Sequence, residues 1–204
     1  MCLMQFIRCA IYMGIFSPIF LSGNMGPQGF HQFKRRVFVE TGTFGGSGIQ
    51  KALDAGFEEI YSIDIDPGHI QFTKERFNQR KNIHLALKDS SYQLWDIIQD
   101  IQEPVVFWLD AHNGWPDPNA IGVKNTPLME ELDQIKRHSI KNHTILIDDL
   151  HCCNTLLFDF LTLEQIIAKV LEINPDYIIS FVPGGDEGEY PNNILVASIP
   201  GEMI

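Results

Sequence analysis

From residue 37 onwards, short runs of β-branched and aromatic residues alternate with segments that carry apolar residues at helical spacing. The runs that we predict to be strands cover residues 37–39, 60–65, 83–87, 105–109, 144–147, 177–182 and 194–199. This alternation predicts an α/β fold: a single domain with a doubly wound, Rossmann-like sheet, mostly parallel, and helices on both faces. The last two runs flank a loop rich in Gly, Asp, Glu and Pro, so we expect a closing hairpin with an antiparallel last strand.

Residues with known capping preferences predict where several helices begin and end. Ser47 is a predicted N-cap, and Gly56 is expected to end the helix that follows it. Asp66, followed by proline, opens the next helix, and Asp89 starts a helix that we expect to continue to about residue 101. Thr162, with a glutamine three residues later, predicts a capping box for the helix before the hairpin.

Length and composition limit the classes of function. The chain has 204 residues, 45% of them hydrophobic, and a formal net charge of −11 at pH 7. This apolar content argues against disorder, and the excess of acid argues against a nucleic-acid partner, which needs a basic surface. The four cysteines, at positions 2, 9, 152 and 153, lack the CxxC spacing of zinc sites, which favours reduced thiols in a cytoplasmic protein.

Residues 1–36 precede the alternating pattern, so we divide the chain into an N-terminal segment and linker (1–36) and a domain (37–204). Residues 9–21 are almost wholly apolar but are shorter than the roughly 20 residues needed to span a bilayer. Their length suits the core of a signal peptide, although Pro18 interrupts it. We expect this segment to pack on the domain or at a homodimer contact, with peripheral membrane contact as the alternative. Residues 22–29 have the composition of a linker.

A carboxylate stands at the end of each of the first five predicted strands. The row consists of Glu40, Asp64, Asp89, Asp110 and the pair Asp148-Asp149. Because ligands of open parallel sheets bind at the carboxyl ends of the strands, we expect these acids to line one edge of the molecule. For any one of these acids, capping of a following helix is the alternative to ligand binding. It suits Asp89, but no predicted helix begins directly after Asp110 or after the pair.

The loop from Glu40 to Gly48 is rich in glycine and lies at the first strand-to-helix turn. It lacks the lysine of a phosphate-binding P-loop, and it does not match the dinucleotide pattern GxGxxG. An acid directly before the loop would repel a pyrophosphate but would attract an ammonium or sulfonium group. Asp64, at the end of the second strand, is placed to accept hydrogen bonds from ribose hydroxyls. A nucleoside with a cationic tail therefore fits this region better than NAD or ATP does.

The successive motifs VETGTFGGSG, YSIDID and LKDSS resemble those of class I S-adenosylmethionine-dependent methyltransferases, over about residues 37 to 200. The resemblance implies that Glu40, Gly42 and Gly45 hold the methionine part of the cofactor, that Asp64 binds the ribose, and that Asp89 and Ser90 frame the adenine. The full set of expected cofactor-binding residues is Glu40, Gly42, Thr43, Gly45, Ser47, Asp64, Asp89, Ser90 and Asp110.

The later motifs FWLDAH and ILIDDLH are similar to those of metal-dependent O-methyltransferases, including the catechol, caffeoyl-CoA, macrolide and aminocoumarin sugar types. The resemblance implies that Asp110, Asp148 and Asp149 bind Mg²⁺ or another divalent cation. The residue chemistry agrees, because carboxylates with open positions for water and substrate oxygens suit a hard cation. Caps and solvated loop acids remain the alternative.

His112 follows Asp110 by two residues, at the place where the sugar-modifying relatives carry a general base. The ordinary pKa of histidine, about 6.5, suits proton abstraction near neutrality. His151, just after the acid pair, is the rival base, and a structural role is open for both histidines. Residues 113–125 form a predicted acceptor-site loop in which Trp115 either stacks on a sugar or fills the core.

These observations together predict a Mg²⁺-dependent O-methyltransferase that uses S-adenosylmethionine and acts on a hydroxyl, in a sugar of a glycan or of a glycosylated small molecule. The expected catalytic residues are Asp110, His112 and His151. One alternative is a metal-dependent glycosyltransferase that uses the DxD motif Asp64-Ile65-Asp66. The other is a non-catalytic nucleoside-binding module on the same fold.

Overall fold

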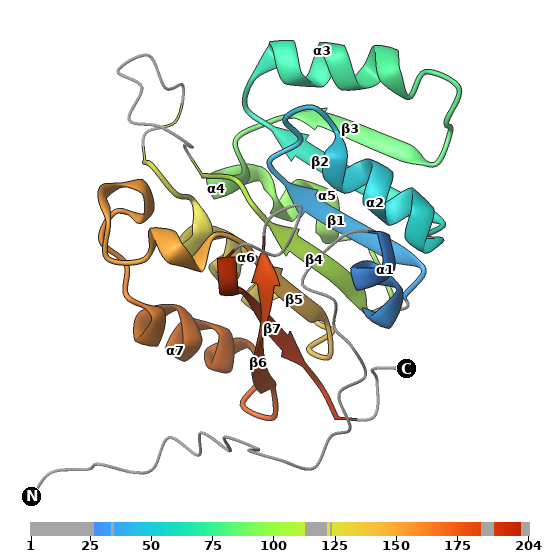
Figure 1. The fold of residues 1–204 in the computed structure, drawn as a ribbon. Coiled ribbons are helices and arrows are strands. Elements are labelled where there is room, and N and C mark those ends of the chain that lie inside the picture. Colours follow the sequence, from blue (N-terminus) through green and yellow to red (C-terminus); the bar gives the residue numbers. More distant parts are fainter. Residues whose placement is uncertain (1–26, 34, 113–121, 123, 185–189, 201–204) are drawn as a thin grey trace, which may run out of the picture.

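The computed structural model describes residues 27–33, 35–112, 122, 124–184 and 190–200, and its sheet has seven strands in the order β3-β2-β1-β4-β5-β7-β6 (Figure 1). The strands are β1 Val37–Thr41, β2 Glu59–Asp64, β3 Ile83–Leu87, β4 Val105–Leu109, β5 Thr144–Ile147, β6 Ile178–Gly184 and β7 Tyr190–Ser198. Neighbours from β3 to β5 pair in parallel, whereas β7 is antiparallel to both β5 and β6. The predicted fold class, including the antiparallel last strand and the hairpin, is confirmed.

Helices cover both faces of the sheet, as Figure 1 shows. The helices are α1 Pro27–Phe30, α2 Ser47–Ala55, α3 Pro67–Arg76, α4 Ser90–Gln93, α5 Trp95–Ile98, α6 Leu128–Arg137 and α7 Leu163–Ile173, and the 3₁₀ turns are η1 His31–Phe33, η2 Leu150–Cys152 and η3 Leu156–Phe158. Side chains alternate along each strand, so β4 supplies Val105, Phe107 and Leu109 to one face and Val106 and Trp108 to the other.

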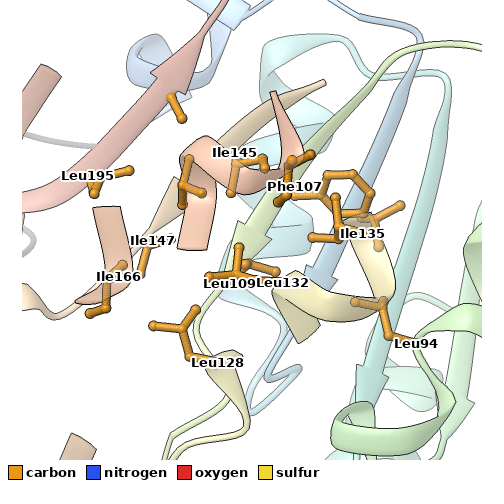
Figure 2. Close-up of a cluster of buried hydrophobic side chains, with 14 of the residues drawn as sticks. Leu94, Phe107, Leu109, Leu128, Leu132, Ile135, Ile145, Ile147, Ile166 and Leu195 are labelled. Atoms are coloured by element: carbon orange, nitrogen blue, oxygen red, sulfur yellow. The ribbon is translucent and has the colours of Figure 1, made fainter. Parts of the chain in front are cut away.

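The two faces have separate hydrophobic clusters. The first, shown in Figure 2, joins the strands to α5, α6 and α7 through side chains such as Phe107, Leu132 and Ile166, all fully buried. The second joins them to α1, α2 and the end of α3. There Phe30 packs edge to face against Phe38 and Trp108, with ring centroids 5.2 and 5.4 Å apart.

Three of the predicted N-caps are present, and Gly56 ends α2 as predicted. Asp66 accepts hydrogen bonds from the N–H groups of Gly68 and His69 at the start of α3. Asp89 accepts from the Ser91 N–H, and Thr162 forms the predicted capping box with Gln165 at the start of α7. These caps depend on local chemistry, which a sequence displays directly.

Four local predictions were wrong. Gly46, not Ser47, is the N-cap of α2, because the chain turns there through a left-handed conformation (φ 75°) that glycine favours. The helix expected from Asp89 to about residue 101 is divided at Leu94 into α4 and α5, since the Trp95 N–H donates to the Gln134 side chain at 2.8 Å. Residues 27–29 of the predicted linker belong to α1. A short 3₁₀ turn, η2, begins directly after Asp149, although its side chain makes no capping hydrogen bond within the described residues.

Residues upstream of the predicted domain boundary also join the core. Phe30 is fully buried, and Phe33 is 4% exposed. Packing of the domain therefore begins before Val37, and the division at residue 36 describes a change of sequence pattern more than a change of structure. The apolar segment 9–21, with Cys2 and Cys9, lies outside the described residues.

Candidate active site

A cavity of about 720 Å³ opens at the carboxyl ends of the parallel strands, where the loops after β1, β2, β3, β4 and β5 meet. Most residues that the sequence marked as functional line it, namely Glu40, Gly42, Thr43, Ser47, Asp64, Asp89, Ser90, Asp110, His112 and Asp149. The row of acids therefore lies along one edge of the sheet, as parallel topology requires.

Glu40 points into this edge from inside β1 and is 1% exposed. Its Oε1 accepts a 2.6 Å hydrogen bond from Ser62, whose oxygen in turn lies 2.6 Å from that of Thr43. Its Oε2 has no hydrogen-bond partner within the described part of the chain. Burial raises the pKa of Glu40 to about 8, the Ser62 hydrogen bond lowers it, and the charge of Asp64 raises it.

Two glycines allow the first loop to pass close to its neighbours. Gly42 has φ 87°, and a Cβ at this position would collide with the backbone carbonyl of Asp110, so the β1 and β4 loops touch there. Gly48 lies against Glu40, and its Cβ would collide with Glu40 Oε2. Gly45, a predicted cofactor contact, is not in the cavity lining, and its carbonyl instead accepts a hydrogen bond from Arg76 at 2.6 Å.

Asp64 is held by the backbone around it. Its Oδ2 accepts from the Phe44 N–H at 2.9 Å, and its Oδ1 accepts from the Asp66 N–H at 2.8 Å. The Nδ1 atom of His69, on α3, lies 3.2 Å from Oδ2. The carboxylate is therefore fixed at the rim of the cavity, with acceptor capacity left on Oδ1.

The loop after β3 is held by α6. The Ser90 hydroxyl donates to Glu131 at 2.6 Å, and Gln134 Nε2 donates to the carbonyls of Ser90 and Ser91 at 2.7 and 3.0 Å. Asp89 Oδ1 accepts from the Ser91 N–H at 2.9 Å. Neither Glu131 nor Gln134 was predicted, since on sequence alone they look like ordinary polar residues of an amphipathic helix.

Asp110, His112 and Asp149 offer ligand atoms that all lie within 4.8 Å of one another, a spacing that allows one metal ion. The Nδ1 atom of His112 lies 3.6 Å from Asp110 Oδ1, and its Nε2 atom lies 3.2 Å from Asp149 Oδ2. The ring of Phe158 packs edge to face on the His112 ring, with centroids 5.3 Å apart. Burial lowers the pKa of His112, which favours the neutral imidazole that can ligate a metal.

Asp148, the remaining predicted ligand, is not part of this group among the described residues. Its Oδ1 accepts from the N–H of Asp149 at 2.8 Å. Asp149 itself has a left-handed backbone (φ 57°), which turns the chain between the two neighbouring acids. Burial raises the pKa of Asp110 well above its ordinary value and that of Asp148 to about 7, and repulsion from Asp149 adds to both effects.

Asn193, on β7, connects Asp149 to His151 and was not predicted. Its Nδ2 donates to Asp149 Oδ1 at 3.1 Å, while its Oδ1 lies 2.9 Å from the His151 backbone nitrogen and 2.8 Å from His151 Nδ1. The backbone N–H can only donate, so the amide orientation is settled, and Nδ1 of a neutral His151 carries the proton. The other ring nitrogen, Nε2, lies 3.6 Å from Cys152 Sγ.

Some predicted features lie outside the described residues. These are Trp115 with most of the predicted acceptor-site loop, and the acidic stretch 185–189. Among the helices that the structure describes, none combines the length and the apolar character needed to cross a membrane.

Comparison with solved structures identifies the fold as that of the methyltransferases. An O-methyltransferase from Bacillus cereus in complex with S-adenosylhomocysteine (SAH) matches with a TM-score of 0.59 and 11% identity, over 90% of this chain and 82% of that chain. A SAH-bound methyltransferase from Podospora anserina matches with a TM-score of 0.56 and 12% identity, over 85% and 75%. An rRNA methylase from Streptococcus thermophilus matches with a TM-score of 0.51 and 13% identity, over 91% and 98%. At these identities the likeness establishes a shared fold. By sequence, no protein-family model and no curated protein matches.

Proposed function

We propose that this chain is an S-adenosylmethionine-dependent O-methyltransferase that uses a divalent cation and acts on a hydroxyl. The observation that carries the proposal is that one cavity contains both a buried acid suited to a cationic cofactor and a separate group suited to a metal. These are Glu40 and the group formed by Asp110, His112 and Asp149. A methyl donor and a metal-bound hydroxyl would therefore meet in the same space.

The cofactor half of the proposal is supported by Glu40 and Asp64. Glu40 has a buried oxygen without a partner among the described residues, and a buried acceptor of this kind is matched by the α-amino group of S-adenosylmethionine. Asp64 has acceptor capacity left for ribose hydroxyls. Both SAH-bound neighbours named above have the same fold. We assign Asp89 and Ser90 to the adenine end of the cavity.

The metal half is supported by the donor set. Asp110 and Asp149 supply carboxylate oxygens and His112 an imidazole nitrogen, and mutual repulsion of the acids would be relieved by a cation. Asp148 would complete the set that the resemblance implies. A bound cation would lower the pKa of the acceptor hydroxyl and fix its position. The carboxylates suit Mn²⁺ as well as Mg²⁺, and the imidazole suits Zn²⁺, so the cation need not be Mg²⁺.

We assign His151 as the general base, because His112 is grouped with the candidate metal ligands. Asn193 holds the His151 ring through its Nδ1 atom. With S-adenosylmethionine bound, the deprotonated hydroxyl oxygen would attack the sulfonium methyl group, and SAH would leave as a neutral thioether. Most of the rate gain would come from positioning of the two reactants. For the acceptor we retain a sugar hydroxyl, on the resemblance of the FWLDAH and ILIDDLH motifs.

The test has two stages. Calorimetry with SAH and with UDP-sugars, each with and without Mg²⁺ or Mn²⁺, separates the methyltransferase from the glycosyltransferase alternative. For that alternative Asp66 is poorly placed, since its Oδ1 caps α3. A labelled-methyl assay on a panel of sugar and catechol acceptors then separates an enzyme from a non-catalytic module. Activity that EDTA removes and a divalent cation restores, and that Asp110→Asn abolishes without loss of SAH binding, would support the proposal. Unaltered activity in Asp110→Asn would contradict the metal role.

A further inference from the structure

Glu131 is a carboxylic acid in an otherwise apolar layer. It lies on α6 on the face that also carries Leu128, Leu132 and Ile135, and it is 1% exposed. Its Oε1 accepts the hydroxyl hydrogen of Ser90 at 2.6 Å. Ser90 belongs to the loop after β3 and lines the cavity. A residue outside the cavity lining therefore orients the hydroxyl of a residue that lines the cavity.

The contact with Glu131 fixes what Ser90 can offer a ligand. A serine hydroxyl has one hydrogen, and here that hydrogen is directed at Glu131. With its hydrogen directed at Glu131, the Ser90 oxygen can only accept a hydrogen bond from a ligand. Asp89, beside it, has its Oδ1 occupied by Ser91 and is likewise an acceptor. A ligand atom that meets this pair of residues must bring a hydrogen.

Gln134, one helical turn along α6, touches the same loop differently. Its amide nitrogen donates to the backbone carbonyls of Ser90 and Ser91, and its oxygen accepts from the Trp95 N–H. Gln134 thus holds the position of the loop without affecting which way the Ser90 hydroxyl points. Gln134 therefore positions the loop, whereas Glu131 sets the direction of the Ser90 hydroxyl.

Keeping an acid at this place is unfavourable for the free protein. Burial raises the pKa of Glu131 to about 7, against the hydrogen bond from Ser90, which lowers it. An apolar residue would pack with its neighbours without that penalty. A buried acid with a raised pKa that contacts a cavity residue is a candidate for a functional role.

We propose that Glu131 is a positioning residue that holds Ser90 as a hydrogen-bond acceptor, so that this end of the cavity selects an amino-purine over an oxo-purine. The inference deepens the proposed function and depends on it. It assigns to this residue pair the discrimination between the 6-amino group of adenine, a donor, and the 6-oxo group of hypoxanthine, an acceptor.

The experiment compares binding of SAH with that of S-inosylhomocysteine, its deaminated 6-oxo analogue, by calorimetry on the full chain. The wild type should prefer SAH by roughly 10-fold or more, the effect expected when a buried acceptor is left facing another acceptor. In Glu131→Leu the Ser90 hydroxyl is free to turn and donate, so this preference should fall several-fold. Glu131→Gln keeps an acceptor oxygen and should retain the preference.

Two further variants make the result specific. Gln134→Met should weaken binding of both analogues by similar factors and leave their ratio unchanged. In a Ser90→Ala background, Glu131→Leu should have no further effect on the ratio, because the hydroxyl through which it acts is gone. Thermal unfolding should show Glu131→Leu to be folded, with a midpoint equal to or above that of the wild type.

The outcomes distinguish failure of the proposed function from failure of the role proposed for Glu131. If the wild type binds neither analogue, the proposed function fails. If it binds SAH but Glu131→Leu, folded, keeps the wild-type ratio, the role of Glu131 is overturned and the proposed function stands. If Glu131→Leu changes the ratio equally with and without the Ser90 hydroxyl, Glu131 acts by another route, and the proposal is again overturned.

Discussion

Asn193 donates a hydrogen bond to Asp149 across the junction between β7 and β5, from a position that is 2% exposed. The same amide accepts from the backbone and the ring of His151. One side chain therefore orients both a candidate metal ligand and the candidate base. Residues that orient ligands from behind in this way usually affect metal affinity almost as strongly as the ligands do.

We predict that Asn193→Ala lowers the affinity for Mn²⁺ by roughly 10- to 100-fold, because Asp149 loses its orienting donor. Titration of Mn²⁺ followed by electron paramagnetic resonance measures this directly. Asn192→Gly is the matched control, since Asn192 is exposed and has a positive φ of 55° that glycine accepts. Wild-type Mn²⁺ affinity in a folded Asn193→Ala protein would contradict the assignment.

Gly48→Ala should weaken SAH binding by about 10-fold or more, because the new Cβ would collide with Glu40 Oε2, which cannot retreat from a buried position. Gly45→Ala is the control. Among the described residues nothing lies within 4 Å of a Cβ at Gly45, and its φ is not positive. Calorimetry on both variants should show a loss for Gly48→Ala alone. Equal affinities would mean that Glu40 does not contact the ligand.

Glu40→Gln should change stability with pH in a definite direction. The pKa of Glu40 is raised to about 8 in the folded protein, so the folded state binds more protons than the unfolded state between pH 4.5 and about 8. Its contribution to stability is therefore present at low pH and is lost as the pH rises through that window, by up to about 1.4 kcal/mol per pH unit. Glu40→Gln should remove this loss and stabilise the free protein at pH 8 relative to the wild type.

Denaturant unfolding at pH 5 and pH 8 measures the effect, and Glu58→Gln, at an exposed acid, serves as the control. The same Glu40→Gln variant should bind SAH more weakly, because it has no charge for the α-amino group. If Glu40→Gln is more stable at pH 8 but binds SAH with wild-type affinity, Glu40 does not contact the cofactor.

His143, which directly precedes β5, should give stability a pH dependence opposite to that of Glu40. It is fully buried, accepts from the Val105 N–H at 3.1 Å, and has a pKa lowered by burial to about 3. Between pH 6.5 and 3 the unfolded state therefore binds the extra proton, and stability falls as the pH falls. From pH 7 to pH 5 this amounts to about 2 kcal/mol. His143→Leu should lose that slope, although it is less stable at pH 7 because Val105 N–H loses its acceptor. His31→Asn, at an exposed site, should keep the wild-type slope.

Most of the strands and the row of acids were predictable, because both depend on short stretches of sequence. Strand ends such as Asp64 and Asp110 can be located from neighbouring residues, and parallel topology then places them together. Caps such as Asp66 are equally local. Ser47 was misassigned because its neighbour Gly46 adopts a left-handed conformation, and a run of three glycines within four residues does not show which of them turns the chain.

The parts of the site that escaped prediction depend on contacts between distant segments. Asn193 reaches Asp149 from β7, and Glu131 reaches Ser90 from α6. Neither residue stands in a motif, so composition and spacing carry no signal for them. The two acids after β5 are adjacent in sequence, yet the left-handed turn at Asp149 gives them different surroundings, and the structure groups Asp149 with His112.

The place of β7 in the sheet has a consequence for how the molecule folds. β7 lies between β5 and β6, so Ile147 pairs with Leu195 and Ile179 with Ala197, and β5 and β6 are neighbours of β7 but not of each other. The β5–β7 pairing joins residues at least 48 positions apart, and contacts of such sequence separation form slowly, because a long loop must close before they are gained. The strand that closes this half of the sheet also carries Asn193. During refolding, the ability to hold a cation should therefore be acquired late, together with insertion of the hairpin, while the glycine loop and Asp64 are assembled from segments close in sequence.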